Sequence, residues 1–239
     1  MKLLELTLDT PEANLALDEA LLDTADEAHE PREVFRIWES PQPLVVLGRA
    51  SRVAEEVHQA NCFAQGIPIL RRCSGGASVV VGPGCLMYAM VLCCRLRPEL
   101  QQISAAHCFA LRTLGDRLRR TVPQIQCQGT SDLTLHGKKF SGNSLRVRRT
   151  HILYHGTILY DFPLASVSAW LRSPPRQPEY RQGRRHDEFL VNLPVGRSEL
   201  RDALVDGMEV DGPLTDWPRQ RTEQLAEARY RQPAWNLRF

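Results

Sequence analysis

Short runs of alternating or continuous apolar residues predict strands in the first third of the chain. Leu3 to Leu8 indicates a first strand, Val34 to Trp38 a second, and Leu44 to Gly48 a buried third. Between the first two, Thr10-Pro11-Glu12 is typical of a helix start, because it combines a hydroxyl cap, an early proline and an acid near the positive helix end. An apolar face follows, so we expect a helix to about Ala28.

The pattern changes several times in the next segment. Glu55 to Gly66 predicts a helix that ends at its glycine, and Ile67 to Leu70 predicts a strand. Ser78 to Val81 predicts another strand, and Leu86 to Cys94 is expected to return antiparallel to it after a turn at 82–84.

Helices and strands also alternate in the second half. Ser104 is expected to cap a helix that reaches about Arg120. Three strands are expected at Leu133 to Leu135, Lys139 to Arg146 and Ile152 to Tyr160, with a hairpin at 136–138 joining the first two. Two short helices are expected at Glu199 to Met208 and Gln220 to Tyr230. The proline- and arginine-rich stretch 171–185 indicates a mobile surface loop.

This order of elements predicts the fold class. Hairpins mixed with helices favour an α+β fold with a central mixed or antiparallel sheet over a regular βαβ repeat. Gly75-Gly76 lacks the third glycine of a dinucleotide-binding fingerprint and lies between strands, which disfavours a Rossmann fold. Nothing marks a domain boundary, so residues 1–239 are expected to form a single domain.

Composition excludes several classes of protein. Hydrophobic residues make up 43% and charged residues 24%, as in soluble globular proteins, and a net charge of +2 does not by itself indicate nucleic acid. Lys2, Glu5 and Asp9 interrupt any signal peptide, and no apolar run is long enough to span a membrane, so a cytoplasmic location is expected. The seven cysteines contain no C-x-x-C pair, which favours buried, reduced thiols over zinc or redox chemistry.

The first candidate ligand-binding block runs from Arg71 to Val79. Gly75 and Gly76 let a ligand approach the backbone closely, free N–H groups can cradle an anion, and Arg72 can add charge-assisted hydrogen bonds. A tight hairpin corner with a solvated arginine pair explains the same residues equally well.

The second and third blocks contain a lysine and a histidine. Lys139 precedes the small residues 141–144, which leave room for a ligand, and Asp132 precedes it across a hairpin. Exposed lysines on a polar hairpin are the alternative. His155 lies in an expected central strand, where we favour a hydrogen-bonded core group over a catalyst, and His186 is expected to be exposed and inert.

Taken in order, these blocks resemble the lipoate–protein ligase A family, within the biotin/lipoate ligase superfamily. The patterns R-R-x-S-G-G-G-x-V, G-x-x-D-L, K-x-S-G-x-x and H-G-T-x-L match Arg71 to Val79, Gly129 to Leu133, Lys139 to Ser144 and His155 to Leu159. N-x-A-x-D-E and Y-x-x-x-x-W-N match Asn14 to Glu19 and Tyr230 to Asn236. The resemblance covers nearly the whole chain and implies a fold like the catalytic cores of class II aminoacyl-tRNA synthetases and biotin synthetases.

The resemblance also implies an activity. Such an enzyme activates lipoate with ATP and Mg²⁺ to lipoyl-AMP, then transfers the lipoyl group to a lysine of a lipoyl-domain protein, such as a 2-oxoacid dehydrogenase E2 subunit or the glycine cleavage H protein. By position, Lys139 is then the catalytic lysine that grips the carboxylate and the phosphate, and Asp132 lies near the phosphate and magnesium. The nucleotide and lipoate loop corresponds to Arg72, Ser74, Gly75, Gly76, Ala77 and Ser78.

The sequence departs from the family pattern at three places. Ala77 replaces the third glycine, at a cost of about 1 kcal/mol if that position needs a left-handed backbone. Val81 replaces a residue that is often polar. The chain ends soon after Trp235, so no C-terminal accessory domain is expected. The resemblance then implies either an accessory protein or catalysis of the transfer half-reaction alone.

Three other functions remain as alternatives. An ATP-independent octanoyl- or lipoyltransferase of the same fold would use a cysteine nucleophile, for which Cys127 is the nearest candidate. A biotin ligase is disfavoured by the R-R-x-S-G-G form. An RNA-binding module that uses Arg146 to Arg149 lacks interleaved aromatic residues for base stacking.

Overall fold

A seven-stranded sheet forms the centre of the computed structural model, which describes residues 1–206 and 208–239. Its strand order is β1-β2-β6-β10-β9-β8-β7, and a smaller sheet has the order β4-β3-β5. The strands are β1 (Lys2–Glu5), β2 (Val34–Trp38), β3 (Leu44–Leu47), β4 (Ile69–Arg71), β5 (Val79–Val81), β6 (Cys85–Cys93), β7 (Ile125–Gln128), β8 (Asp132–Leu135), β9 (Lys138–Val147) and β10 (His151–Leu159).

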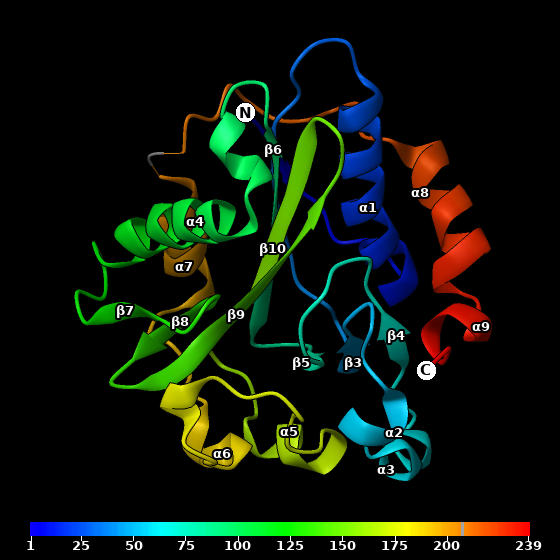
Figure 1. The fold of residues 1–239 in the computed structure, drawn as a ribbon, viewed down its shortest axis with the longest axis vertical. Coiled ribbons are helices and arrows are strands. Elements are labelled where there is room, and N and C mark those ends of the chain that lie inside the picture. The colour runs from blue at the N-terminus through cyan, green and yellow to red at the C-terminus, as the bar shows by residue number, and fades with distance from the viewer. Residues whose placement is uncertain (207) are drawn as a thin grey trace.

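Helices cover both faces of the large sheet. Figure 1 shows α1 and α8 on one side of β10, and α4 and α7 on the other. The helices are α1 (Pro11–Glu27), α2 (Val53–Glu56), α3 (Gln59–Ala64), α4 (Ile103–Leu118), α5 (Ala165–Trp170), α6 (His186–Phe189), α7 (Arg197–Val205), α8 (Arg219–Leu225) and α9 (Pro233–Asn236), with 3₁₀ turns η1 (Pro98–Gln101) and η2 (Glu179–Arg181) and a π-helical turn η3 (Ala226–Tyr230). This arrangement confirms the predicted α+β class.

Local sequence explains where helix α1 begins but not where α4 begins. The Thr10 hydroxyl accepts a hydrogen bond from the Ala13 N–H at 3.3 Å, and Pro11 occupies the first helical turn, as predicted for α1. The predicted cap of α4 is wrong: Gln102 is its N-cap, without a side-chain cap hydrogen bond, and Ser104 lies inside the helix. Packing of its buried apolar face therefore stabilises α4 in place of a cap.

Three other local predictions need correction. Segment 55–66 forms two short helices, α2 and α3, rather than one. Strand β7 was not predicted, because Ile125–Gln128 has a mostly polar sequence and pairs only at the edge of the sheet. The expected hairpin between Ser78 to Val81 and Leu86 to Cys94 does not form: β5 pairs with β3, whereas β6 pairs with β2 and β10.

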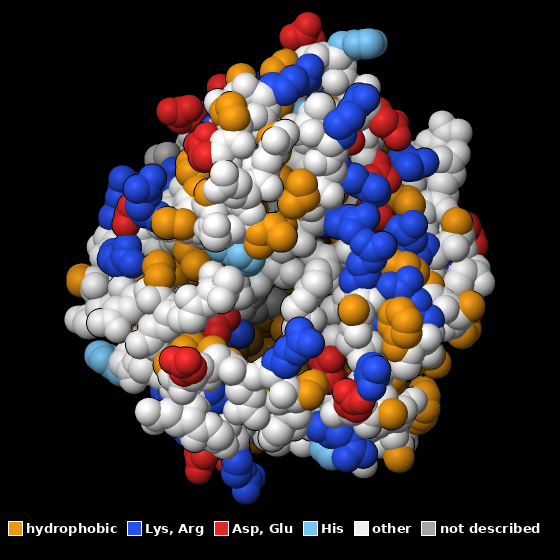
Figure 2. Space-filling model, in the orientation of Figure 1, with side chains coloured by type: hydrophobic (Ala, Val, Ile, Leu, Met, Phe, Trp, Pro, Cys, Tyr) orange, Lys and Arg blue, Asp and Glu red, His pale blue; other side chains and the backbone are white. Residues whose placement is uncertain are grey.

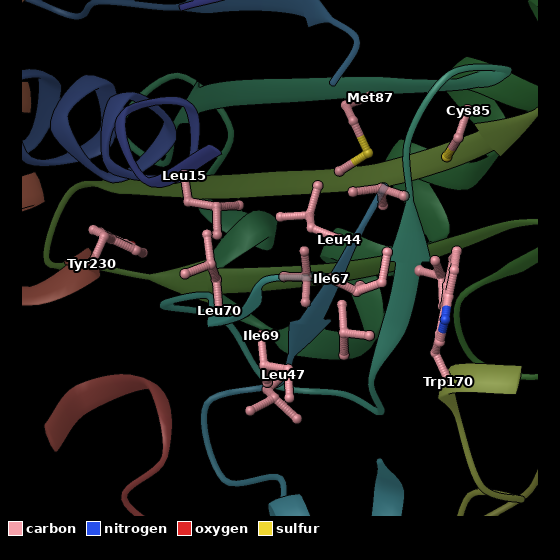
Figure 3. Packing of buried hydrophobic residues seen from close by; sticks show 14 of the residues in the cluster. Leu15, Leu44, Leu47, Ile67, Ile69, Leu70, Cys85, Met87, Trp170 and Tyr230 are labelled. Carbon is pink, nitrogen blue, oxygen red and sulfur yellow. The ribbon is translucent and has the colours of Figure 1, made fainter. Parts of the chain in front are cut away.

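The apolar interior has one cluster on each face of the large sheet and a third around the small sheet. Figure 3 shows this third cluster, in which Leu44 and Leu47 of β3 are surrounded by Leu15 of α1, Trp170 of α5 and Tyr230 near the C-terminal end of the sequence. Elements from both ends of the sequence thus fix the small sheet against the large one, and the candidate site lies between the two sheets.

A buried ion pair connects α1 to β2. The Arg36 guanidinium, fully buried, lies 2.6 Å from Asp18 Oδ1 and also donates hydrogen bonds to the Asn14 side chain and the Leu6 carbonyl. Burial by itself raises the pKa of Asp18, but Arg36 and a hydrogen bond from His155 outweigh it and lower that pKa, so the carboxylate is ionised. A charged pair this deep is tolerated because its hydrogen bonds replace water.

We predict that Arg36→Met lowers the free energy of unfolding by about 3–5 kcal/mol, because it leaves the Asp18 carboxylate buried without its cation. Arg52→Met is the matched control: Arg52 pairs with Glu55 at the surface, so the loss should be under about 1 kcal/mol. Urea unfolding measures both, and equal losses in the two variants would show that the buried pair has no special role.

Candidate active site

A cavity of about 430 Å³ lies where β9, β10, the loop after β4 and the segment 171–190 meet. Figure 2 shows this face of the molecule hollowed near its centre, with Lys and Arg side chains gathered beside the hollow. The apolar part of the lining includes Val46, Val80, Met87, Leu159 and Val167. Strands β3 and β5 both contribute to it, so a ligand with an apolar chain has a suitable wall.

The loop after β4 is held in shape by Arg72. Its Nε donates to Ser74 Oγ at 3.0 Å, and its Nη2 donates to the carbonyls of Gly75 and, at 3.0 Å, Ala77. Gly76 has a φ of 83°, which favours glycine, whereas Ala77 is not left-handed. The alanine in place of the third glycine therefore causes no backbone strain.

Arg71 and Arg72 have different environments. Arg71 is fully buried and donates to the carbonyls of Gly48 at 2.7 Å, Ser51 at 2.8 Å and Asn236 at 3.1 Å. It therefore joins the end of β3 to α9 and is unavailable to a ligand. Arg72 lines the cavity, and burial lowers its pKa to about 10, so it remains a cation near neutral pH.

Lys139 and Asp132 form the charged centre of the cavity. Lys139 Nζ lies 2.7 Å from Asp132 Oδ1, and the Tyr180 hydroxyl donates to Asp132 Oδ2 at 2.7 Å. Burial and the nearby carboxylate raise the pKa of Tyr180, which keeps this hydroxyl protonated. One oxygen of the Asp132 carboxylate thus pairs with the Lys139 ammonium, and the other accepts from Tyr180.

One tight turn places the lysine there. The hairpin predicted at 136–138 forms, with His136 and Gly137 at φ values of 51° and 71°, so β9 begins with Lys138 exposed and Lys139 turned toward the cavity. A Cβ at Gly142 would lie 2.6 Å from Lys139 Cε and 2.7 Å from its Nζ. The absence of a side chain at Gly142 therefore makes room for the lysine itself.

His155 is a hydrogen-bonded interior group, as favoured from the sequence, although its ring also forms part of the cavity wall. Its Nε2 lies 2.6 Å from Ser74 Oγ, and its Nδ1 lies 3.3 Å from Asp18 Oδ2. The neighbouring residue must be a glycine, Gly156, because a Cβ there would lie 1.9 Å from Asn143 Oδ1.

The stretch 171–185, expected from its composition to be a mobile surface loop, is part of a longer segment, 171–190, that packs over the cavity. It lines the cavity, contains η2, and buries Arg181 to 4% exposure. The expectation for His186 is also wrong, because it is 9% exposed and its Nε2 lies 3.1 Å from the Arg172 carbonyl. Proline and arginine counts did not reveal that this segment packs over a site.

The structure brings most of the predicted site residues together. The lining includes Arg72, Gly76, Ala77, Ser78, Asp132 and Lys139. Ser74 and Gly75 do not line it: Ser74 is 1% exposed, whereas Gly75 is exposed and its carbonyl accepts from Ser144 Oγ at 2.9 Å. Val81 is fully buried and does not contact the cavity.

Two further residues of the site were not identified from the sequence. Tyr180 was assigned to the loop, and Glu56 accepts from the N–H of Ser78 at 2.8 Å and from its hydroxyl at 2.7 Å. Each is distant in sequence from the residue it contacts, and neither belongs to a recognisable motif, so no sequence signal pointed to them.

Within the described parts of the chain, no cysteine lines the cavity. Cys127 is exposed, with its Sγ 3.7 Å from Arg119 Nη2. Cys73 lies next to the glycine loop but is buried, and burial raises the pKa of its thiol, which disfavours a reactive thiolate. The candidate nucleophile Cys127 is therefore outside the cavity that holds Lys139.

An α+β fold with a cavity that joins apolar walls to a lysine, an arginine and a glycine loop defines an enzyme site for an anionic ligand with an apolar part. Comparison with known proteins identifies the family. Residues 10–194 match the lipoyl protein ligase A/B catalytic domain, so the chain belongs to that enzyme family.

Several curated proteins are similar to the chain. A putative lipoate-protein ligase A from Aeropyrum pernix is 28% identical over 66% of this chain and 56% of its own length. A probable lipoate-protein ligase A from Mycoplasma pneumoniae is 27% identical over 67% and 46%. An octanoyltransferase LipM from Kyrpidia tusciae is 27% identical over 94% of both chains. The chain spans about half the length of the first two relatives.

Solved structures share the fold. The bi-partite lipoate protein ligase of Thermoplasma acidophilum, studied with its E2 lipoyl domain, superposes with a TM-score of 0.83 at 22% identity, over 99% of this chain and 96% of that one. A lipoate-protein ligase A bound with ATP gives 0.79 at 21% identity, over 99% and 98%. In the described residues, no helix is long and apolar enough to cross a membrane.

We predict that Gly142→Ala displaces the Lys139 side chain without unfolding the protein, because the added methyl meets only the flexible end of that side chain. Acetylation followed by mass spectrometry measures this directly, since the sequence has only three lysines, Lys2, Lys138 and Lys139. Lys139 should react faster in the variant and Lys138 at an unchanged rate.

Gly196→Ala is the matched control, because a Cβ there would have nothing within 4 Å. It should leave all three labelling rates unchanged. An unchanged rate at Lys139 in Gly142→Ala would contradict the proposed role of this glycine.

Proposed function

We propose that the protein is a lipoate–protein ligase, which activates lipoate with ATP to lipoyl-AMP and transfers the lipoyl group to a lysine of a lipoyl-domain protein. The observation that carries this proposal is that Lys139 and the glycine loop 76–78 line one cavity together with an apolar wall. Lipoate requires both the charged part and the apolar part of such a site, because it has a carboxylate at one end and an aliphatic chain attached to it.

The charges of the cavity suit the first half-reaction. A lipoate oxygen forms a bond to the α-phosphorus of ATP while the bond to pyrophosphate breaks, and two anions must meet for this to occur. Lys139 and Arg72 offset their repulsion, and the N–H groups of the glycine loop add hydrogen bonds to the developing charge. A carboxylate that enters would replace Asp132 as the partner of the Lys139 ammonium.

The second half-reaction depends on the exclusion of water more than on charged side chains in the site. The acceptor lysine attacks the acyl carbon of lipoyl-AMP, AMP leaves with the electron pair of the broken C–O bond, and the amine loses a proton. Acyl-adenylates react with water, so a covered site is useful. The segment 171–190, with Tyr180 hydrogen-bonded to Asp132, provides such a cover.

The residues present do not form a protein-held magnesium site. In the described residues, no group of three or more His, Cys, Asp or Glu side chains could hold a metal ion. Asp132, the predicted ligand, already has both oxygens occupied by Lys139 and Tyr180. Mg²⁺ would therefore enter with the nucleotide, held mainly by phosphate oxygens, and we assign it no step.

The comparisons support the choice of partners. The ligase studied with its E2 lipoyl domain, and the ligase bound with ATP, are similar to this chain in fold. E2 lipoyl domains, and by extension the glycine cleavage H protein, are thus the proposed acceptors. The bi-partite nature of the first ligase supports an accessory protein for this chain as well. A cytoplasmic location and a single catalytic domain over 1–239 are part of the same proposal.

The second candidate function is an ATP-independent octanoyltransferase. The similarity to LipM over 94% of both chains favours it. Against it, the cysteine-free lining leaves no nucleophile beside Lys139 in the described residues. We therefore place the ligase first.

We predict that Lys139→Ala lowers lipoate-dependent exchange of labelled pyrophosphate into ATP by about 100- to 1,000-fold, because it removes a charge that stabilises the transition state. Lys138→Ala should retain most activity, since Lys138 is exposed on the opposite face of β9. Equal losses in both variants, or none in either, would refute the role given to Lys139.

We predict that Cys127→Ala leaves ATP-dependent lipoylation unchanged within about twofold, because the thiol lies outside the cavity. Mass spectrometry after incubation with an octanoylated donor protein should find no acyl group on Cys127 of the native chain. An acyl-enzyme that disappears in the variant would establish the transferase instead.

A further inference from the structure

A chain of five polar side chains runs from the core to the glycine loop. It begins at Arg36, passes through Asp18 and His155, and ends at Ser74 and Arg72. All five residues are at most 8% exposed. The chain thus crosses from α1 through β10 to the loop, almost entirely out of water.

The direction of its hydrogen bonds follows from chemistry. Asp18 is ionised and can only accept, so His155 must carry its proton on Nδ1. In the neutral ring with this tautomer, Nε2 is an acceptor, and Ser74 donates to it at 2.6 Å. Ser74 Oγ in turn accepts from Arg72 Nε at 3.0 Å, so each partner has one defined role.

An acid, a histidine and a serine in this order also form the arrangement that activates a nucleophilic serine. Two observations exclude that role here. Ser74 is 1% exposed, and it does not line the cavity. An attacking oxygen needs access to its substrate, and Ser74 has none.

We propose that Asp18, His155 and Ser74 are positioning residues that hold Arg72, and through it the loop 75–78, in the shape that receives the ligand. This inference rests on the proposed function for the identity of the ligand. Arg72 Nη2 donates to the carbonyls of Gly75 and Ala77, which leaves the backbone of the loop fixed around Gly76. If Ser74 loses its acceptor, its hydroxyl is free to rotate and Arg72 loses a directed partner.

Two isosteric variants of His155 separate positioning from general packing. Glutamine places its amide oxygen near the position of Nε2 and can still accept from Ser74, whereas asparagine places its amide near Nδ1 and keeps only the contact with Asp18. Both remove one ring contact, so a purely structural role predicts similar effects. A positioning role predicts that only the asparagine variant impairs ligand binding.

The kinetic experiment measures KM for ATP and kcat in pyrophosphate exchange, with thermal unfolding as a check on the fold. His155→Asn and Ser74→Ala should raise KM by about tenfold or more, the cost of a hydrogen bond to a charged group, and His155→Gln by less than about threefold. The KM of the double variant Ser74→Ala/His155→Asn should equal that of either single variant. Equal KM values for the Gln and Asn variants, or multiplying effects in the double variant, would overturn the proposal.

A spectroscopic experiment does not depend on activity. Nitrogen-15 NMR of the histidine rings should show His155 as a neutral ring protonated on Nδ1 in the native protein and in Ser74→Ala. A ring protonated on Nε2 in the native protein would overturn the proposal even if exchange is normal. Absence of lipoate-dependent exchange in the native protein, with the Nδ1 form observed, would instead refute the proposed function and leave the hydrogen-bond chain established.

Discussion

The pairing of Lys139 with Asp132 is the interaction on which the site depends. A partly buried ammonium needs an anion, and Asp132 provides it at 2.7 Å. The same carboxylate accepts from Tyr180, so the state of the lysine is coupled to the segment that covers the cavity. An incoming acid that takes over the ammonium also changes the environment of Tyr180. A ligand that displaces Asp132 from Lys139 would therefore also act on the segment 171–190, through Tyr180.

Buried charge organises the rest of the molecule in a similar way. Asp18 compensates Arg36 in the core and orients His155 on the cavity side of the sheet. Arg71 has no carboxylate in an ion pair with it among the described residues, and donates instead to backbone carbonyls just after β3 and in the C-terminal segment. The two adjacent arginines of one motif thus have different roles: Arg71 joins the end of β3 to the C-terminal segment, and Arg72 holds the glycine loop in shape.

Much of the architecture follows from local sequence. Helix α1, strands β2 and β3 and the hairpin before β9 formed as predicted, because each depends on a cap, an alternation or a turn residue within a few positions. The structure also brings Lys139 and Gly76 together, but only the resemblance to a family predicted that these two distant segments share one site.

Predictions that depend on which segments pack against each other were less successful. The strand at 79–81 pairs with β3 and not with its neighbour in sequence, and a run of valines does not by itself indicate which strand it pairs with. The segment 171–185 was predicted as a surface loop from its prolines and arginines, yet Tyr180 contacts Asp132, which is distant in sequence, and Arg181 is 4% exposed.

The central claim is that one cavity receives an acid and a nucleotide together. A crystal structure with a non-hydrolysable lipoyl-adenylate analogue tests it most directly. The account predicts that the linkage between the acyl group and the adenosine lies within hydrogen-bond distance of Lys139 Nζ, with the phosphate substitute against loop 76–78 and the aliphatic chain against Val46, Met87 and Leu159. An analogue bound elsewhere, or bound with Lys139 still paired to Asp132 and out of reach of the linkage, would contradict it.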